Sequence, residues 1–242
     1  MQIVRVNDVE IAYRRTGQGP TVLLLHPVGL DSSWWQPFAD QLAPRFSVVS
    51  MDFRGHGSSA PVMGKMDLAD LADDAAALLR ALGLAQAQVV GLSMGGMVAQ
   101  QLAIRHPDVV RSLVLLGTVC TLPDEARKQM AARGETARQQ GMSAVIGATL
   151  ERWFTPAALT AELAKRCERR LLENDTESWA ASWCAISRLD TLPLLKRIKA
   201  PTLVVTGNRD VSTPPAAATM IADNIPGAAL AIIEGAPHMG PF

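Results

Sequence analysis

One serine of this chain stands in a segment that is suited to covalent chemistry. Ser93 lies in the glycine-rich segment Gly91–Gly96, which follows the apolar pair Val89-Val90 and precedes an amphipathic stretch, Met97–Arg105. A Gly-x-Ser-x-Gly turn between a strand and a helix forms a nucleophile elbow. Its glycines let strand and helix approach closely, and the strained turn lifts the serine Oγ out of the sheet. We therefore predict that Ser93 is a nucleophile for acyl transfer.

A serine nucleophile needs a base that accepts its proton and a carboxylate that orients the base. For this kind of elbow the expected chain order is Ser, then Asp or Glu, then His. Asp210 follows the apolar run Thr202–Thr206, and His238 lies in a loop after the run Ala229–Glu234. Both positions are carboxyl ends of predicted strands, where open α/β sheets bind ligands. We predict Ser93, Asp210 and His238 as the catalytic set.

Other carboxylates and histidines fit these two roles less well. Asp190 precedes a helical stretch instead of following a strand, and Glu234 ends a strand just before the histidine loop. Among the histidines, His106 stands at a helix end and is expected to cap or decorate that helix. His26 precedes the serine in the chain, and we expect it to brace its own loop by hydrogen bonding.

The tetrahedral oxyanion of acyl transfer needs hydrogen-bond donors that are already in place. The backbone N–H of Met94, directly after the nucleophile, is the first. The second is expected from the loop after Thr21–Leu25, and Val28 is predicted because Pro27 has no N–H. The turn Asp52–Ser59 also follows a predicted strand, but its polar side chains are interpreted as structural.

Short apolar runs alternate with helical patterns, which predicts an α/β fold with a mostly parallel, doubly wound sheet. The predicted strands are Thr21–His26, Phe46–Met51, Ala87–Gly91, Ser112–Gly117, Pro201–Gly207 and Ala229–Glu234. Leu203-Val204-Val205 is apolar on both faces, as in a strand that is covered on both sides. Ile3–Arg15 alternates around Asn7-Asp8 and predicts a hairpin at the sheet edge. Met66–Leu82 has one apolar face and predicts a helix.

One region breaks this alternation. Between Pro123 and about Leu195 the predicted elements are the helices Arg127–Gln140, Met142–Phe154, Pro156–Glu173 and Ser178–Ser187. We interpret residues 123–195 as a helical lid that is inserted into an α/β core of residues 1–122 and 196–242. A thick helical layer or a separate small domain is the alternative. The lid is favoured because the block falls between the serine and the later Asp and His.

The composition narrows the classes of partner. The chain has 242 residues with 23 Lys+Arg and 23 Asp+Glu, without a long basic run, so nucleic acid is a poor partner. Its three cysteines and four histidines lack metal-ligand spacing, so neither a metal nor an organic cofactor is expected. No signal peptide and no membrane-length apolar run is visible, which favours the cytoplasm. A homo-oligomer is compatible with this composition.

Together these segments resemble the α/β-hydrolase fold over nearly the whole chain. The matching segments, in order, are His26–Gly29, Asp52–Gly57, Gly91–Gly96, Gly207–Asp210 and Ala236–His238. Glu151–Pro156 and Cys184–Asp190 are similar to lid segments of 3-oxoadipate enol-lactonases, which open a lactone in bacterial aromatic catabolism. The resemblance implies the triad and the two oxyanion donors given above.

The same resemblance places Arg152 and Trp153 near the substrate. Arg152 could pair with the free carboxylate of an acidic lactone, or it could be a solvated helix residue. Trp153 could wall the pocket, or together with Phe154 it could anchor the lid to the sheet.

The predicted activity is hydrolysis of a small-molecule ester or lactone through an acyl-enzyme, with 3-oxoadipate enol-lactone as the specific candidate. The alternatives are a general carboxylesterase, a carbon–carbon bond hydrolase or a perhydrolase of this fold, or a ligand-binding protein without chemistry. A haloalkane or epoxide hydrolase is excluded because those enzymes have a carboxylate at the elbow. Relatives usually continue into a helix beyond the position of Phe242, so we expect the His238 loop to exchange its amide hydrogens faster than the core.

Overall fold

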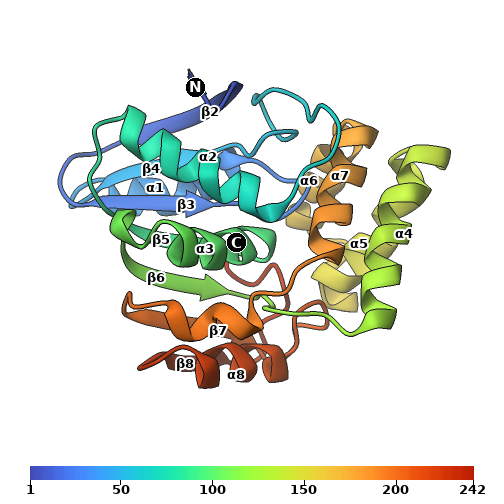
Figure 1. Cartoon of the computed structure of the whole chain (residues 1–242). Coiled ribbons are helices and arrows are strands. Elements are labelled where there is room, and N and C mark those ends of the chain that lie inside the picture. Colours follow the sequence, from blue (N-terminus) through green and yellow to red (C-terminus); the bar gives the residue numbers. More distant parts are fainter.

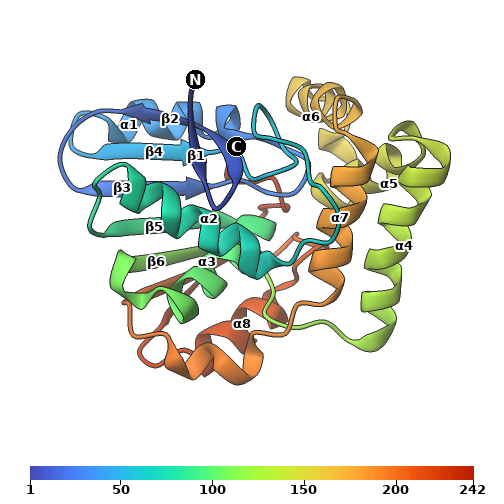
Figure 2. The same ribbon diagram turned by 45° about the horizontal axis from the view of Figure 1, so that its top comes forward.

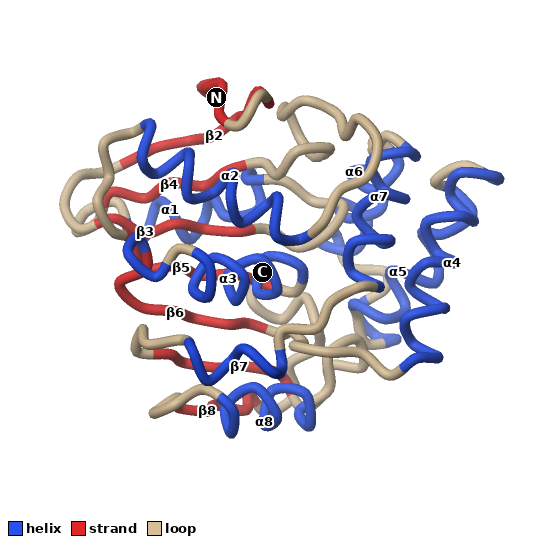
Figure 3. Tube along the Cα trace, in the orientation of Figure 1, coloured by secondary structure: helices blue, strands red, loops and turns tan.

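An eight-stranded sheet forms the centre of the computed structural model, which describes all 242 residues (Figures 1 and 3). The strands are β1 (Gln2–Val6), β2 (Val9–Thr16), β3 (Thr21–Leu25), β4 (Ser47–Met51), β5 (Ala87–Leu92), β6 (Val110–Leu116), β7 (Thr202–Gly207) and β8 (Ala229–Ile233). Their order is β1-β2-β4-β3-β5-β6-β7-β8, and all pairs from β4 to β8 are parallel. The predicted mostly parallel, doubly wound sheet is confirmed.

The strand order changes direction at the pair β3 and β5. The chain passes from β3 to β4 on one side and then returns to place β5 on the other side of β3. Connections from these two strands leave on opposite courses, which opens a crevice at their carboxyl ends. The loop after β3 and the glycine segment after β5 therefore lie next to each other in space.

The N-terminal hairpin forms as the sequence predicts. Strands β1 and β2 pair antiparallel with Val6 opposite Val9, so Asn7 and Asp8 form the two-residue turn. Both turn residues have positive φ, 46° and 62°, as a turn that matches the twist of a hairpin requires. Strand β2 then joins the parallel strands through an antiparallel pairing with β4.

Helices cover both faces of the sheet (Figure 1). Helices α2 (Leu68–Ala81), α3 (Met94–Arg105) and α8 (Pro215–Asn224) pack on the face that holds the main apolar core. The predicted helix Met66–Leu82 is thus present and slightly shorter. Helix α1 (Gln36–Leu42) lies on the opposite face over a smaller apolar cluster. No helix has the length and apolarity to cross a membrane.

Four helices gather beyond the carboxyl ends of the parallel strands, at the right of Figures 1 and 2. They are α4 (Asp124–Gln140), α5 (Ser143–Trp153), α6 (Glu162–Leu172) and α7 (Thr176–Ser187). The chain enters and leaves this block at one point, because Thr121 and Asp190 form an isolated β-bridge. The block therefore stands over the crevice between β3 and β5.

The sequence did not reveal a break inside this block. The predicted helix Pro156–Glu173 is divided into a 3₁₀ turn at Pro156–Ala158 and helix α6, which begins at Glu162. Ala161 is extended, with ψ 155°, and the acidic Glu162 occupies the first turn of the new helix, where the helix dipole favours a negative charge. No glycine or proline marks Thr160 or Ala161, so the pattern carries no stop signal there.

Candidate active site

Ser93 stands on a sharp turn between β5 and α3. Its backbone has φ 56° and ψ −117°, a strained conformation for a residue with a side chain. The turn is close packed: a Cβ on Gly91 would lie 2.2 Å from the Gly95 carbonyl oxygen, and one on Gly95 would lie 2.2 Å from that of Leu25. The Ser93 N–H donates to the Leu116 carbonyl at 2.9 Å, which fixes the turn on the neighbouring strand.

His238 and Asp210 are in direct contact. The His238 Nδ1 lies 2.8 Å from Asp210 Oδ2, and each side chain is 1% exposed. Asp210 also accepts hydrogen bonds from the backbone N–H groups of Ser212 and Thr213, both at 2.8 Å, and from the Thr213 hydroxyl at 2.7 Å. The turn after β7 thus holds the carboxylate with donors on several sides.

These contacts decide the charge of Asp210 and the tautomer of His238. Burial alone would raise the pKa of Asp210, but the hydrogen bond and charge of His238, with the Thr213 bonds, keep it below its ordinary value. An ionised Asp210 accepts the Nδ1 proton of His238, so the lone pair of the neutral imidazole is at Nε2. That Nε2 is buried and has no hydrogen-bond partner in the protein.

Ser93 and His238 face the same small cavity, of about 50 Å³, beneath the four-helix block. Its wall is largely apolar, with side chains from the α/β core and from the helical block. Trp153 belongs to this wall, is 4% exposed, and has its ring centroid 6.3 Å from that of His238. No hydrogen bond joins Ser93 and His238 in this structure, although both residues line the same cavity.

The loop after β3 forms a turn that orients the Val28 N–H. The Leu30 N–H donates to the Pro27 carbonyl at 3.3 Å, and Gly29 has φ +75°. His26 braces the same carbonyl, because its Nε2 accepts from the Phe53 N–H at 3.0 Å while its Nδ1 lies 2.8 Å from the Pro27 oxygen. In a planar peptide the N–H points away from the C=O, so these two bonds also fix the Val28 N–H.

The two predicted oxyanion donors belong to buried residues. Val28 lines the cavity and is 2% exposed, and Met94 is fully buried at the start of α3. Neither N–H donates in any hydrogen bond between loop backbone groups. Both amides are thus placed close to Ser93 and remain available as donors.

Arg152 also lines the cavity, and the structure adds an arginine that the sequence analysis missed. Arg133, on α4, has its guanidinium 4.9 Å from the centre of the Trp183 ring. Neither arginine forms an ion pair or a side-chain hydrogen bond, although both charges lie near the cavity. Burial and the charge of Arg152 lower the pKa of Arg133 to about 10. The sequence offered one sign that Arg133 faces the cavity: it lies between Met130 and the buried Ala137 on one face of its helix.

The structure does not bring the weaker candidates to this site. Asp190 and Glu234 are exposed and make no contact with His238. His106 bonds to Asp73 at 2.7 Å, at the end of α3. In the turn Asp52–Ser59, the Asp52 carboxylate accepts backbone N–H groups of its own turn and of the loop after β3.

Two buried histidines give this protein a pH-dependent stability. Burial is the largest cause that lowers the pKa of His26 to about 4 and that of His56 to about 3, from an ordinary value of 6.5. The unfolded chain therefore binds more protons than the folded one below pH 6.5, so stability is full above that pH and falls as the pH drops towards 4. We expect a loss of about 1.4 kcal/mol per pH unit for each histidine.

Urea unfolding at several pH values measures this slope. The His56→Gln variant keeps a polar side chain that does not titrate, and it is expected to have about half the wild-type slope. A free energy of unfolding that does not change between about pH 5 and about pH 6.5 would contradict the neutral state of both histidines.

Comparison with known proteins places the chain in a family. The sequence profile of the alpha/beta hydrolase fold family matches residues 20–242, and this protein belongs to that family. The class fits the sheet order and the serine turn described above.

The relatives that match over most of the chain include enol-lactonases and a methyl ester esterase. The chain is 29% identical to 3-oxoadipate enol-lactonase 2 of Acinetobacter baylyi over 94% of its own length and 86% of that protein. It is 35% identical to a pimeloyl-[acyl-carrier protein] methyl ester esterase of Chromobacterium violaceum, over 93% and 89% of the two chains. The structure matches the enol-lactonase from Burkholderia xenovorans with a TM-score of 0.89 and 32% identity, over 96% and 90%. This protein is therefore an α/β hydrolase that is similar to enol-lactonases.

Proposed function

We propose that this protein hydrolyses an ester or lactone of a small molecule through an acyl-enzyme on Ser93. The observation that supports this best is the buried His238, whose Nδ1 contacts Asp210 at 2.8 Å while its Nε2 has no partner and its ring lines the cavity with Ser93. An imidazole held in this way is a general base for a serine hydroxyl.

In the proposed mechanism His238 Nε2 takes the proton of Ser93 as Oγ attacks the substrate carbonyl carbon. The N–H groups of Val28 and Met94 stabilise the oxyanion that forms. The protonated His238 then gives its proton to the leaving oxygen, and the acyl group remains on Ser93. Water, deprotonated by the same nitrogen, attacks this ester and releases the acid. Asp210 stays ionised and stabilises the imidazolium.

We further propose that residues 123–195 are a lid. The cavity of about 50 Å³ has room for a few water molecules at most, because one water needs about 10–15 Å³ by this kind of measure. A lactone or ester enters when the helices above Ser93 or their side chains move. Closure then excludes water from the reacting groups.

The unpaired arginines support a substrate that carries a carboxylate. Arg133 and Arg152 project from two different helices to one cavity, and neither has an acidic partner. Both residues are half-buried, and a partly desolvated guanidinium without an acidic partner gains charge-assisted hydrogen bonds when a substrate carboxylate binds. The relative from Acinetobacter baylyi is named as a 3-oxoadipate enol-lactonase, and 3-oxoadipate is a compound that carries carboxylates. We propose an acidic enol-lactone or a half-ester of a dicarboxylic acid as substrate.

Arg133→Met and Arg152→Met are expected to change selectivity. Each substitution keeps an unbranched apolar stem and removes the charged guanidinium, so kcat/KM for an aryl half-ester of a dicarboxylic acid falls by about 10- to 100-fold. Hydrolysis of a neutral aryl acetate stays close to wild type. Lys128→Met is the matched control. Lys128 lies on α4, as Arg133 does, but it is exposed and outside the cavity.

A substrate panel measured in a pH-stat tests the proposed activity itself. It contains the neutral aryl ester, a neutral lactone, the acidic enol-lactone and a diketone that only a carbon–carbon bond hydrolase would cleave. We expect ester and lactone hydrolysis with a preference for the acidic compounds. Cleavage of the diketone alone, or of none of the four, would contradict the proposal.

A further inference from the structure

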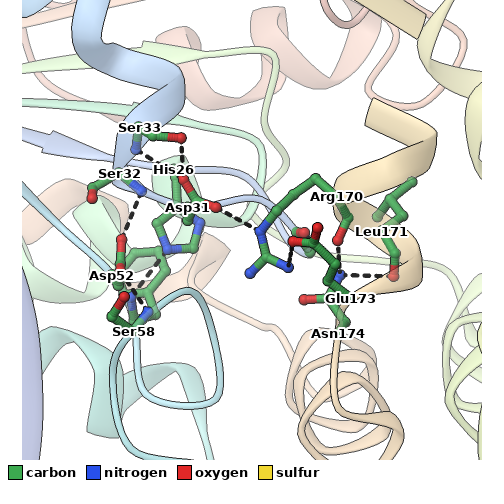
Figure 4. A network of polar contacts seen from close by, with 12 residues as sticks. His26, Asp31, Ser32, Ser33, Asp52, Ser58, Arg170, Leu171, Glu173 and Asn174 are labelled. Carbon is green, nitrogen blue, oxygen red and sulfur yellow. Dashed lines mark hydrogen bonds and ion pairs between the residues drawn. The ribbon is translucent and has the colours of Figure 1, made fainter. Parts of the chain in front are cut away.

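The loop that carries Val28 is held from above by the helical block. Asn174, between α6 and α7, is 9% exposed and its side-chain amide donates to the Gly29 carbonyl at 2.9 Å. The same nitrogen lies 3.1 Å from the Leu171 carbonyl and 3.4 Å from that of Arg170, which close the end of α6 (Figure 4). One amide thus joins the last turn of α6 to the turn Pro27–Leu30.

A second contact links the same helix to the same loop. Arg170 reaches from α6 to Asp31, with Nε 2.5 Å from Oδ2, and both side chains are only 14% exposed (Figure 4). Asp31 is itself fixed, because its other carboxylate oxygen accepts the Ser33 N–H at 2.9 Å. Burial would raise the pKa of Asp31, but Ser33 and Arg170 keep it below its ordinary value, so the pair is ionised.

Between these two contacts the helices pack directly on Gly29. A Cβ at this position would lie 2.6 Å from Leu171 Cδ2 and 2.6 Å from Trp179 Cζ3. The turn is therefore held by α6 and α7 through an amide, an ion pair and close packing. None of these groups lines the cavity that contains Ser93.

We propose that Asn174 is a positioning residue for the Val28 oxyanion donor, and that Arg170 assists it. The inference rests on the proposed function of Val28. His26 and the Leu30 N–H fix the Pro27 carbonyl from the core side, while Asn174 fixes the Gly29 carbonyl from the lid side. Along the chain, the Val28 N–H lies between these two fixed carbonyls, so the direction of the N–H depends on both.

This arrangement couples lid closure to catalysis. When α6 and α7 move away from the core, Gly29 and Asp31 lose their partners and the turn is held from one side only. When the lid closes, the same contacts return and the donor is directed at the position of the oxyanion. The enzyme then reaches full transition-state stabilisation only while the substrate is enclosed.

Kinetics of Asn174→Ala test the proposal with a neutral aryl ester as substrate. A misplaced oxyanion donor weakens the transition state and not the ground state, so kcat is expected to fall by about 10- to 100-fold while KM stays near the wild-type value. An arylboronic acid, which forms a tetrahedral adduct with a nucleophilic serine, is expected to bind more weakly by the same factor. Arg170→Met is expected to change both quantities in the same direction and by less.

Arg188→Met is the matched control. Arg188 also joins the lid to the core, through the Met66 carbonyl at 2.6 Å, but it does not contact the loop of Val28. We expect its kcat and boronate affinity to be close to wild type. Equal losses in Arg188→Met and Asn174→Ala would contradict the proposal, as would an unchanged kcat in a folded Asn174→Ala protein.

Two other results would distinguish a failure of the positioning role from a failure of folding or of the proposed function. If Asn174→Ala does not fold, Arg170→Met decides alone, and an unchanged kcat in that variant would contradict the proposed positioning of Val28 by α6. If the wild-type protein neither hydrolyses the ester nor binds the boronate, the proposed function fails. An active wild type with unaffected Asn174 and Arg170 variants would contradict the positioning role of these two residues and leave the proposed function of Ser93 standing.

Discussion

Ser93→Ala is expected to lower the turnover of a small activated ester by a factor of about 10⁴ or more. The substitution removes the atom that attacks the carbonyl. None of the three free thiols lines the cavity, and burial raises the pKa of Cys120 to about 11 and that of Cys167 to about 12, so we do not expect a thiol to replace Ser93. Alanine keeps the Cβ and the N–H that bonds to Leu116, so the turn is retained. Steady-state kinetics with an aryl ester measure the loss.

Ser212→Ala is the matched control for this experiment. Ser212 lines the same cavity, but its hydroxyl donates to the Arg152 carbonyl at 3.0 Å and only its backbone N–H serves Asp210. The variant is expected to keep its activity within about threefold. A Ser93→Ala protein that folds and hydrolyses the ester at the wild-type rate would exclude the acyl-enzyme mechanism.

Asp210→Asn is expected to have the second largest effect, a loss in kcat of about 10³- to 10⁴-fold. The amide keeps the shape of the carboxylate but offers a donor to His238 Nδ1, which then becomes an acceptor. The proton moves to Nε2, and the nitrogen that faces the cavity can no longer accept the proton of Ser93. The charge that stabilises the imidazolium is also lost.

The control for Asp210→Asn removes a charge near the histidine loop without touching His238. Glu234→Gln serves this purpose, because Glu234 is exposed at the end of β8 and forms no ion pair. It is expected to leave kcat unchanged. A loss of the same size in Glu234→Gln, or wild-type activity of Asp210→Asn over the whole pH range, would contradict the assignment of Asp210.

Much of the fold could be predicted because its signals are local. The apolar runs gave the strands to within a few residues, with the largest difference in β6, which begins at Val110 instead of Ser112. Positive φ at Asn7 and Asp8 follows from the residue types of the hairpin turn. Ser93, Asp210 and His238 each stand just after a strand, so one rule on sheet edges located all three. Their catalytic roles stay a prediction.

The features that the sequence did not predict depend on contacts between segments that are distant in the chain. Arg133 becomes a cavity residue only because α4 packs against α7 and α5 in the helical block, and the sequence around it has the pattern of an ordinary polar helix. Asn174 and Gly29 are 145 residues apart in the chain, and neither has a pattern that announces the other. The extended Ala161 that ends one predicted helix has no turn residue beside it. Such features require the three-dimensional structure.

The most direct test of the central claim is the mass of the protein after reaction with a fluorophosphonate, followed by peptide mapping of the adduct. The probe phosphonylates a serine that is activated by a histidine, with loss of fluoride and one proton. We predict one adduct per chain, on the peptide that contains Ser93, and no adduct in Ser93→Ala under the same conditions. An adduct on another residue, or no adduct on wild-type protein that hydrolyses esters, would contradict Ser93 as the nucleophile.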